Sequence, residues 1–105
     1  MKSFENFLNE GILRKTEDAL TSNHLKWNPS ASTATSAGNK HKVTLRVEKE
    51  HGGKKMAEKI KSHLEKIKYH DVSIKETDAN HLMKDEHKGD HNIYHDVVAY
   101  KSKWD

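Results

Sequence analysis

The chain contains no cysteine, a single proline and only two arginines among its 105 residues. The absence of cysteine excludes a disulfide framework and a thiolate zinc site, so packing alone must hold the fold together, as in intracellular proteins. No apolar run is longer than the four residues 97–100, which is too short for a membrane span or for the apolar part of a signal peptide. We therefore expect a soluble protein that begins in a cytoplasm and binds no membrane.

Charge is distributed unevenly along the chain. The formal net charge is +3, yet residues 54–70 alone hold six lysines and only two glutamates, while residues 71–105 hold more acidic than basic side chains. A lysine-rich helix face either meets phosphates or is simply solvated. Because arginine is the side chain best suited to bidentate contacts with bases and phosphates, its scarcity argues against sequence-specific recognition of nucleic acid.

The centre of the chain changes its hydrophobic period twice. Apolar residues alternate over 43–47, recur at helical spacing over 56–67 and alternate again over 72–74, which predicts a strand, a helix and a parallel strand. The β-branched and aromatic residues of 92–101 predict a third strand, antiparallel to its neighbour. We therefore predict an α+β domain over residues 41–105, a βαββ layer with one amphipathic helix on a three-stranded mixed sheet. The expected core is Val43, Leu45, Val47, Ile60, Leu64, Ile67, Val72, Ile74 and Val97.

The residues before this domain divide into three segments. Residues 1–10 predict a helix of about two turns, with Ser3 as its N-cap and Gly11 as its stop signal. Residues 11–27 have a weak helical pattern. Residues 28–40 have almost no apolar surface to bury, so they predict a flexible linker. One face of the third strand carries Tyr94, Val98 and Tyr100, and we expect Leu13, Leu20 or Trp27 to cover part of it.

Histidines and glycines give weaker signals. His81, Asp85, His87, Asp90, His91 and His95 lie within fifteen residues, and a helix would stack three of these imidazoles. Gly89 and the β-like run after it argue against that helix, so we predict polar loop histidines, no metal and no cofactor. Gly52 and Gly53 precede a predicted helix that could hold an anion, although the geometry of the turn explains them more simply. Leu82 and Met83 either extend the second strand or form a helical turn over the core.

The first eleven residues carry the sharpest functional signal, Leu8-Asn9-Glu10 followed by Gly11. This segment resembles the capsid-targeting sequences of internal head and prohead-core proteins of large tailed bacteriophages of the T-even group. The resemblance implies that Phe4, Phe7 and Leu8 form a docking face, and that the prohead protease reads Leu8 and Glu10 and cuts the Glu10–Gly11 bond. Ile74-Lys75-Glu76 matches the same three-residue signal, but it lies in a predicted strand that a protease could not bind extended.

The resemblance implies a non-enzymatic internal head protein, located in the head interior after assembly and in the host cytoplasm before it and after any delivery with DNA. Its expected partners are the prohead core or shell, the prohead protease, packaged DNA and a host defence protein. Two alternatives remain open. Residues 1–10 can instead be an ordinary helix packed on the domain. The protein can instead be a non-specific nucleic-acid-binding module that uses a lysine-rich helix face of Lys54, Lys55, Lys59, Lys61, Lys66 and Lys68.

Overall fold

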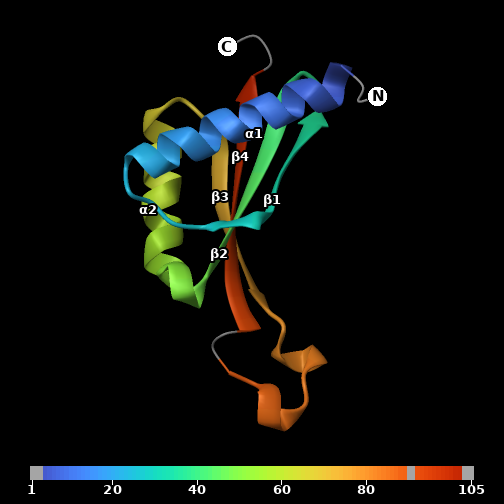
Figure 1. Ribbon diagram of the computed structural model, residues 1–105, viewed down its shortest axis with the longest axis vertical. Helices are drawn as coiled ribbons and strands as arrows, with labels where there is room; N and C mark the ends of the chain where they lie inside the picture. Colours follow the sequence, from blue (N-terminus) through green and yellow to red (C-terminus); the bar gives the residue numbers. More distant parts are fainter. Residues whose placement is uncertain (1–3, 90–91, 103–105) are drawn as a thin grey trace.

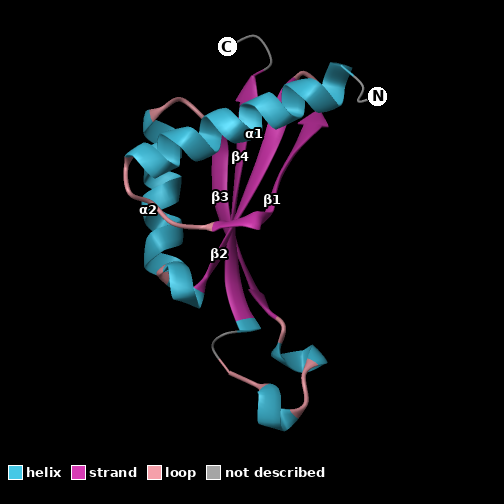
Figure 2. Ribbon diagram, viewed as in Figure 1, coloured by secondary structure: helices cyan, strands magenta, loops and turns pink. Residues whose placement is uncertain are grey.

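The computed structural model describes residues 4–89 and 92–102, with side chains from residue 10 onward. Its order is α1 (Phe4–Ser22), β1 (Asn28–Ala37), β2 (Lys40–Glu48), α2 (Gly53–Lys66), β3 (His70–Asp78) and β4 (Ile93–Ser102). Three short 3-10 turns are added, η1 (Lys49–His51), η2 (Asn80–Leu82) and η3 (Asp85–His87). Figures 1 and 2 show α1 running across one end of the sheet and α2 running beside the strands.

The four strands form one antiparallel sheet in the order β1-β2-β4-β3. The predicted βαββ layer, with one helix on a three-stranded mixed sheet, is therefore wrong. β2 and β3 do run in the same direction, as expected across the helix α2, but β4 lies between them and pairs with both. A helical crossover fixes the relative direction of two strands and not their adjacency. β4 carries apolar side chains on both faces of the sheet, with Val97 and Ala99 toward the core and Val98 on the opposite side.

The predicted linker over residues 28–40 is also wrong, because most of it is strand β1. β1 pairs with β2 through a two-residue turn at Gly38-Asn39, and Gly38 has a φ of +65°. Glycine at the first position of a two-residue hairpin turn suits the twist of the flanking strands. β1 is an edge strand, where Pro29 is tolerated because one side of the strand needs no ladder donors. Its side chains are small and mostly polar, including the buried Ser32 and the partly buried Ala34. They form no alternation of apolar and polar residues from which a strand could be predicted.

Helix α1 continues through Gly11 instead of stopping there, so the predicted break between residues 10 and 11 is absent. Glycine in a helix interior costs about 1 kcal/mol relative to alanine. Burial on the C-terminal side of Gly11 offsets that cost: Thr16 and Leu20 are fully buried, and Ile12 and Leu13 pack against the core. The spacing of these four residues places them on one side of the helix.

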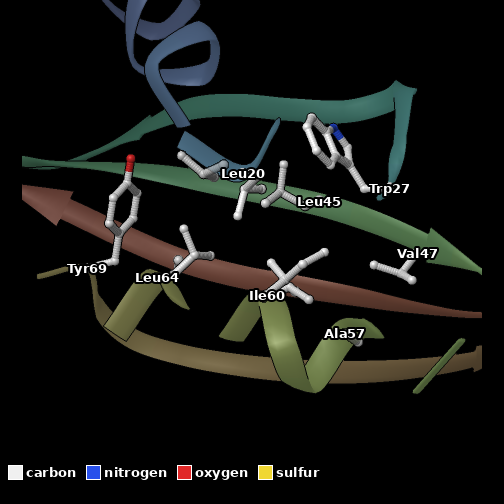
Figure 3. Close-up of a cluster of buried hydrophobic side chains, with 11 residues drawn as sticks. Leu20, Trp27, Leu45, Val47, Ala57, Ile60, Leu64 and Tyr69 are labelled. Carbon is white, nitrogen blue, oxygen red and sulfur yellow. The ribbon is translucent and has the colours of Figure 1, made fainter. Parts of the chain in front are cut away.

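Both helices cover the same face of the sheet. Figure 3 shows Leu20 and Trp27, from the N-terminal part of the chain, near Leu45, with Ile60 and Leu64 of α2 on the other side of the cluster. The buried apolar residues are Leu20, Trp27, Val43, Leu45, Val47, Ala57, Ile60, Leu64, Tyr69, Val97 and Ala99. Ile67, Val72 and Ile74 of the predicted core pack against this cluster and are only partly buried.

A buried hydrogen bond ties α1 to the connection between α2 and β3. The hydroxyl of Thr16 donates to the carbonyl oxygen of Ile12 at 2.7 Å and therefore accepts a hydrogen bond from the Tyr69 hydroxyl. Burial raises the pKa of the Tyr69 phenol above its ordinary value. The phenol therefore keeps its proton, and with it the donor of this hydrogen bond, to a higher pH than an exposed tyrosine would.

The connection between β3 and β4 projects beyond the end of the sheet (Figure 1). Asn80 holds it together, because its Oδ1 accepts hydrogen bonds from the Gly89 N–H and from Asn92 Nδ2, both at 2.8 Å. Leu82 ends the 3-10 turn η2 and is 76% exposed, and Met83 follows it at 40%. Neither expectation for these two residues holds, since they form no strand and cover no core.

Candidate functional site

The face of the sheet opposite the helices faces solvent, and we name it the open face. Burial alternates strictly along β2 and over residues 94–100 of β4, so every second side chain there points away from the core. The strand register places these outward side chains in rows across the sheet. The open face is defined by Lys42, Thr44, Arg46 and Glu48 of β2, Tyr94, Asp96, Val98 and Tyr100 of β4, and Ser73, Lys75 and Thr77 of β3.

Two tyrosines of the open face each lie next to a basic side chain. Tyr100 is directly opposite Lys42 in the register of β2 and β4. The guanidinium carbon of Arg46 lies 4.0 Å from the centre of the Tyr94 ring. Arg46 Nε also contacts Asp96 Oδ1 at 3.2 Å, and the two side chains are only 33% and 16% exposed. A partly desolvated carboxylate thus holds the guanidinium group over the ring, in a cation–π arrangement.

The prediction that Leu13, Leu20 or Trp27 cover Tyr94, Val98 and Tyr100 is wrong. Leu20 and Trp27 are buried in the core on the opposite face, and Leu13 packs against that same core. The reason is the alternation of the strands: the face with Val43, Leu45 and Val47 is the more apolar, so both helices pack there. The open-face side chains of β4 therefore stay partly exposed.

The six lysines predicted to contact nucleic acid do not act as one set. Lys61 lies 3.6 Å from Glu65, one turn further along α2, and shares its side of the helix with Glu58. Lys55, Lys59 and Lys66 follow each other at spacings of four and seven, form a separate stripe and are exposed. Lys54 and Lys68 are also exposed, at either end of the helical segment.

The predicted processing signal lies inside helix α1. Glu10 and Gly11 are exposed and helical, while the side chains of Phe4, Phe7, Leu8 and Asn9 lie outside the described part of the structure. A protease binds its substrate extended, so the helix must unwind locally around the Glu10–Gly11 bond before it is cut. The second match, Ile74-Lys75-Glu76, lies in strand β3, where it pairs with β4.

Backbone geometry explains the two glycines before α2. Gly52 has a φ of +119° and Gly53 a φ of +61°, which other residues rarely adopt. A Cβ atom on Gly52 would lie 2.9 Å from the Cβ of Met56. A hollow of about 180 Å³ beside this turn is lined by Lys49, Gly53, Ile93 and His95. The Nδ1 atom of His95 is buried and has no hydrogen-bond partner among the described residues.

The histidines of residues 81–95 are not gathered into one site among the described residues. His81 Nδ1 contacts the carbonyl oxygen of Asp78 at 3.0 Å. His87 is exposed in η3, the turn that also contains Asp85. His95 is buried in β4, on the face of the sheet that the helices cover. Asp90 and His91 lie outside the described residues. The stack of imidazoles would require a helix over residues 87–95, whereas His87 lies in the 3-10 turn η3 and His95 in strand β4.

A different trio, Glu48, Glu50 and His51, places three possible ligand atoms within 4.8 Å of one another. The Nδ1 atom of His51 accepts a hydrogen bond from the Glu48 N–H at 3.1 Å. The neutral ring therefore keeps its proton on Nε2, which lies 3.7 Å from Glu50 Oε1 and is not available as a lone-pair donor. The cluster caps the short turn η1, which accounts for its geometry.

Sequence reasoning identified the tyrosines of the open face and missed its basic residues. Lys42, Arg46 and Lys75 are the outward-facing residues of two strands that were predicted correctly, so alternation alone could have placed them on the face opposite Leu45. Alternation does not predict the pairing register of the strands. The register places Lys42 next to Tyr100, although the two residues are 58 positions apart in the sequence.

In the described part of the chain, no helix is long and apolar enough to cross a membrane. Comparison of the chain with protein-family models, with curated proteins and with solved structures finds no match to any of the three.

Proposed function

We propose that this protein is a non-enzymatic internal head protein of a T-even-like phage, carried into the prohead by its N-terminal residues and cut after Glu10. The observation that supports the proposal is the position of those core contacts of α1 that the structure describes, from residue 10 onward. Ile12, Leu13, Thr16 and Leu20, which pack on or in the core, all follow the Glu10–Gly11 bond. Cleavage there removes ten residues and leaves these contacts with the sheet in place.

The mature protein fits a location beside packaged DNA. Removing residues 1–10 deletes one lysine and two glutamates, so the formal net charge rises from +3 to +4. After delivery with the genome, the same small domain acts by binding a host factor rather than by catalysis. The head interior and, before assembly and after delivery, the host cytoplasm are its proposed locations.

Cleavage by the prohead protease is the direct test. We expect co-expression of the full chain with a T-even-like prohead protease to yield one product, whose intact mass corresponds to residues 11–105. Glu10→Gln should block the cut, because the protease reads the carboxylate at that position. Glu76→Gln is the matched control and should leave cleavage unchanged, since Glu76 lies in the paired strand β3.

Two results contradict the proposal. One is a full chain that stays intact in the presence of an active protease. The other is full-length protein, or no protein, in purified particles of the phage that encodes it. Cleavage after Glu76 in the folded chain would show that the three-residue signal alone, without its location, directs the protease.

A second candidate function, non-specific binding of duplex DNA, is favoured by one observation. The exposed stripe of Lys55, Lys59 and Lys66 on α2 has no carboxylate within it. Such a row neutralises phosphates without reading bases.

Charge reversal tests this candidate. We expect Lys59→Glu with Lys66→Glu to weaken binding of duplex DNA at low salt by about tenfold or more, and to reduce the salt dependence by about 0.9 for each phosphate that is no longer neutralised. The matched control, Lys42→Glu with Lys75→Glu, makes the same charge change on the opposite side of the sheet and should leave duplex binding nearly unchanged. Equal losses in both pairs, measured by fluorescence anisotropy, would show that only net charge matters.

A further inference from the structure

The open face holds two of the three tyrosines in a chain that has only seven aromatic residues. The third, Tyr69, is buried in the core, where its role is structural. Tyr94 and Tyr100 contribute no packing beneath the helices, because they point to the other side of the sheet. Their rings are partly exposed on an inner strand, which is the position at which a sheet presents aromatic rings to a ligand.

The two rings are spaced for an extended ligand. Six residues along one strand separate them, which corresponds to roughly 20 Å. This length suits a short single strand of nucleic acid, since folds that bind single strands cover sites of roughly 4 nucleotides or more. Between the rings, Val98 is paired with Thr44, next to the ion pair of Arg46 and Asp96.

The charges of the open face favour phosphate groups. The open face has two acidic side chains, Asp96 and Glu48, and Asp96 is already bound by Arg46. Glu48, at the end of β2, accepts a hydrogen bond from Asn28 Nδ2 at 3.1 Å. Lys42 and Lys75 have no ion-pair partner among the described residues, so their charges are available to a ligand. Lys42 lies opposite Tyr100, and Lys75 lies opposite Asp96, between the levels of the two rings.

Stacking requires bases that are not paired. In a duplex the faces of the bases are covered by their neighbours, so a flat sheet can reach only the backbone. Single strands expose both the base faces and the phosphates, and base–aromatic stacking is tolerant of sequence. Arg46 over Tyr94 adds a planar cationic group on which a base can also stack.

We propose that the open face binds single-stranded nucleic acid, with bases stacked on Tyr100 and on the Arg46–Tyr94 pair and with phosphates at Lys42 and Lys75. This inference is independent of the processing of the N-terminus. It also assigns nucleic-acid binding to the side of the sheet opposite the lysine stripe of α2.

The test uses the full chain and fluorescein-labelled dT and rU oligonucleotides of about 12 nucleotides. We expect fluorescence anisotropy at low salt to show binding of at least one of them. Tyr100→Leu should weaken this binding by about tenfold, because the ring on which one base stacks is removed. Tyr100→Phe should stay within about twofold of the original chain, since it keeps the ring. Tyr94→Leu should repeat the loss at a second position.

A matched pair of charge variants locates the phosphates. Lys42→Gln with Lys75→Gln should reduce the slope of log affinity against log salt by about 0.7 for each phosphate that the lysines no longer neutralise. Lys55→Gln with Lys59→Gln removes the same charge from α2 and should leave that slope unchanged. Far-UV circular dichroism and thermal melting of every variant ensure that a loss of binding is not a loss of fold.

Four outcomes overturn the inference. The first is the absence of binding to both oligonucleotides at low salt. The second is a Tyr100→Phe variant that loses as much affinity as a folded Tyr100→Leu variant, which would exclude stacking. The third is an effect confined to the α2 lysine pair, which would move the binding surface to the helix. The fourth is that duplex DNA binds more tightly than either single strand and that the tyrosine variants do not change this binding. This result would also move the binding surface to the helix.

Discussion

A chain that begins at Lys40 will not fold, whereas a chain that begins at Gly11 will unfold cooperatively, as the full chain does. The two truncations differ in what they remove from the core. Starting at Lys40 deletes Leu20 and Trp27, which are 0% and 9% exposed, together with strand β1. Starting at Gly11 keeps these residues and the hydrogen bond between Thr16 and Tyr69.

The expected size of the effect follows from burial. Burying one large apolar side chain contributes roughly 1.5–3 kcal/mol, so losing Leu20 and Trp27 removes about 3–6 kcal/mol. Domains of this kind have about 5–15 kcal/mol in total, and small ones lie near the lower end. The loss of β1 adds to the deficit, because it exposes the outer edge of β2 and uncovers the core beneath Ala34.

Urea denaturation followed by circular dichroism of three chains, beginning at Met1, Gly11 and Lys40, measures this difference. The Lys40 chain should show no cooperative transition. A Lys40 chain that unfolds cooperatively, within about 1 kcal/mol of the full chain, would contradict the role of α1 and β1 in the core. A Gly11 chain that fails to fold would instead contradict the proposed removal of residues 1–10.

The secondary structure could be predicted from the sequence where the spacing of apolar residues matches the period of a strand or a helix. The alternation over 43–47 and 72–74 and the helical spacing over 56–67 correspond to β2, β3 and α2. β1 escaped detection because its Ser, Thr and Ala residues form no apolar pattern. Its strand conformation depends on pairing with β2, on a two-residue turn at Gly38 and on α1 packed above it. Tertiary context of this kind overrides local propensity.

The strand order of the sheet and the neighbours of each residue on the open face could not be predicted from the sequence, for the same reason. Period shows which residues of a strand face the same way, but it does not show which strand lies alongside. The position of β4 between β2 and β3 decides both the sheet order and the neighbours of Tyr100. The lysines of α2 were easier to find, because helical neighbours lie only three or four residues apart in sequence.

Leu45→Ala will lower the free energy of unfolding by about 2–5 kcal/mol, the usual range for truncating a fully buried leucine. Leu45 is 0% exposed and sits opposite Val97 in the register of β2 and β4. Figure 3 places it at the centre of the cluster, between Leu20 and Trp27 on one side and Ile60 on the other. The surrounding side chains belong to both helices and the sheet, so they cannot move together to close the cavity.

Leu82→Ala is the matched control, because it makes the same chemical change at a side chain that is 76% exposed. It should alter the free energy of unfolding by about 0.5 kcal/mol or less. Urea denaturation of both variants compares them on one scale, with an unchanged m-value as the sign that the unfolded state is the same. Similar losses for the two leucines, or a loss of less than about 1 kcal/mol for Leu45→Ala, would mean that the helices do not share one core over β2.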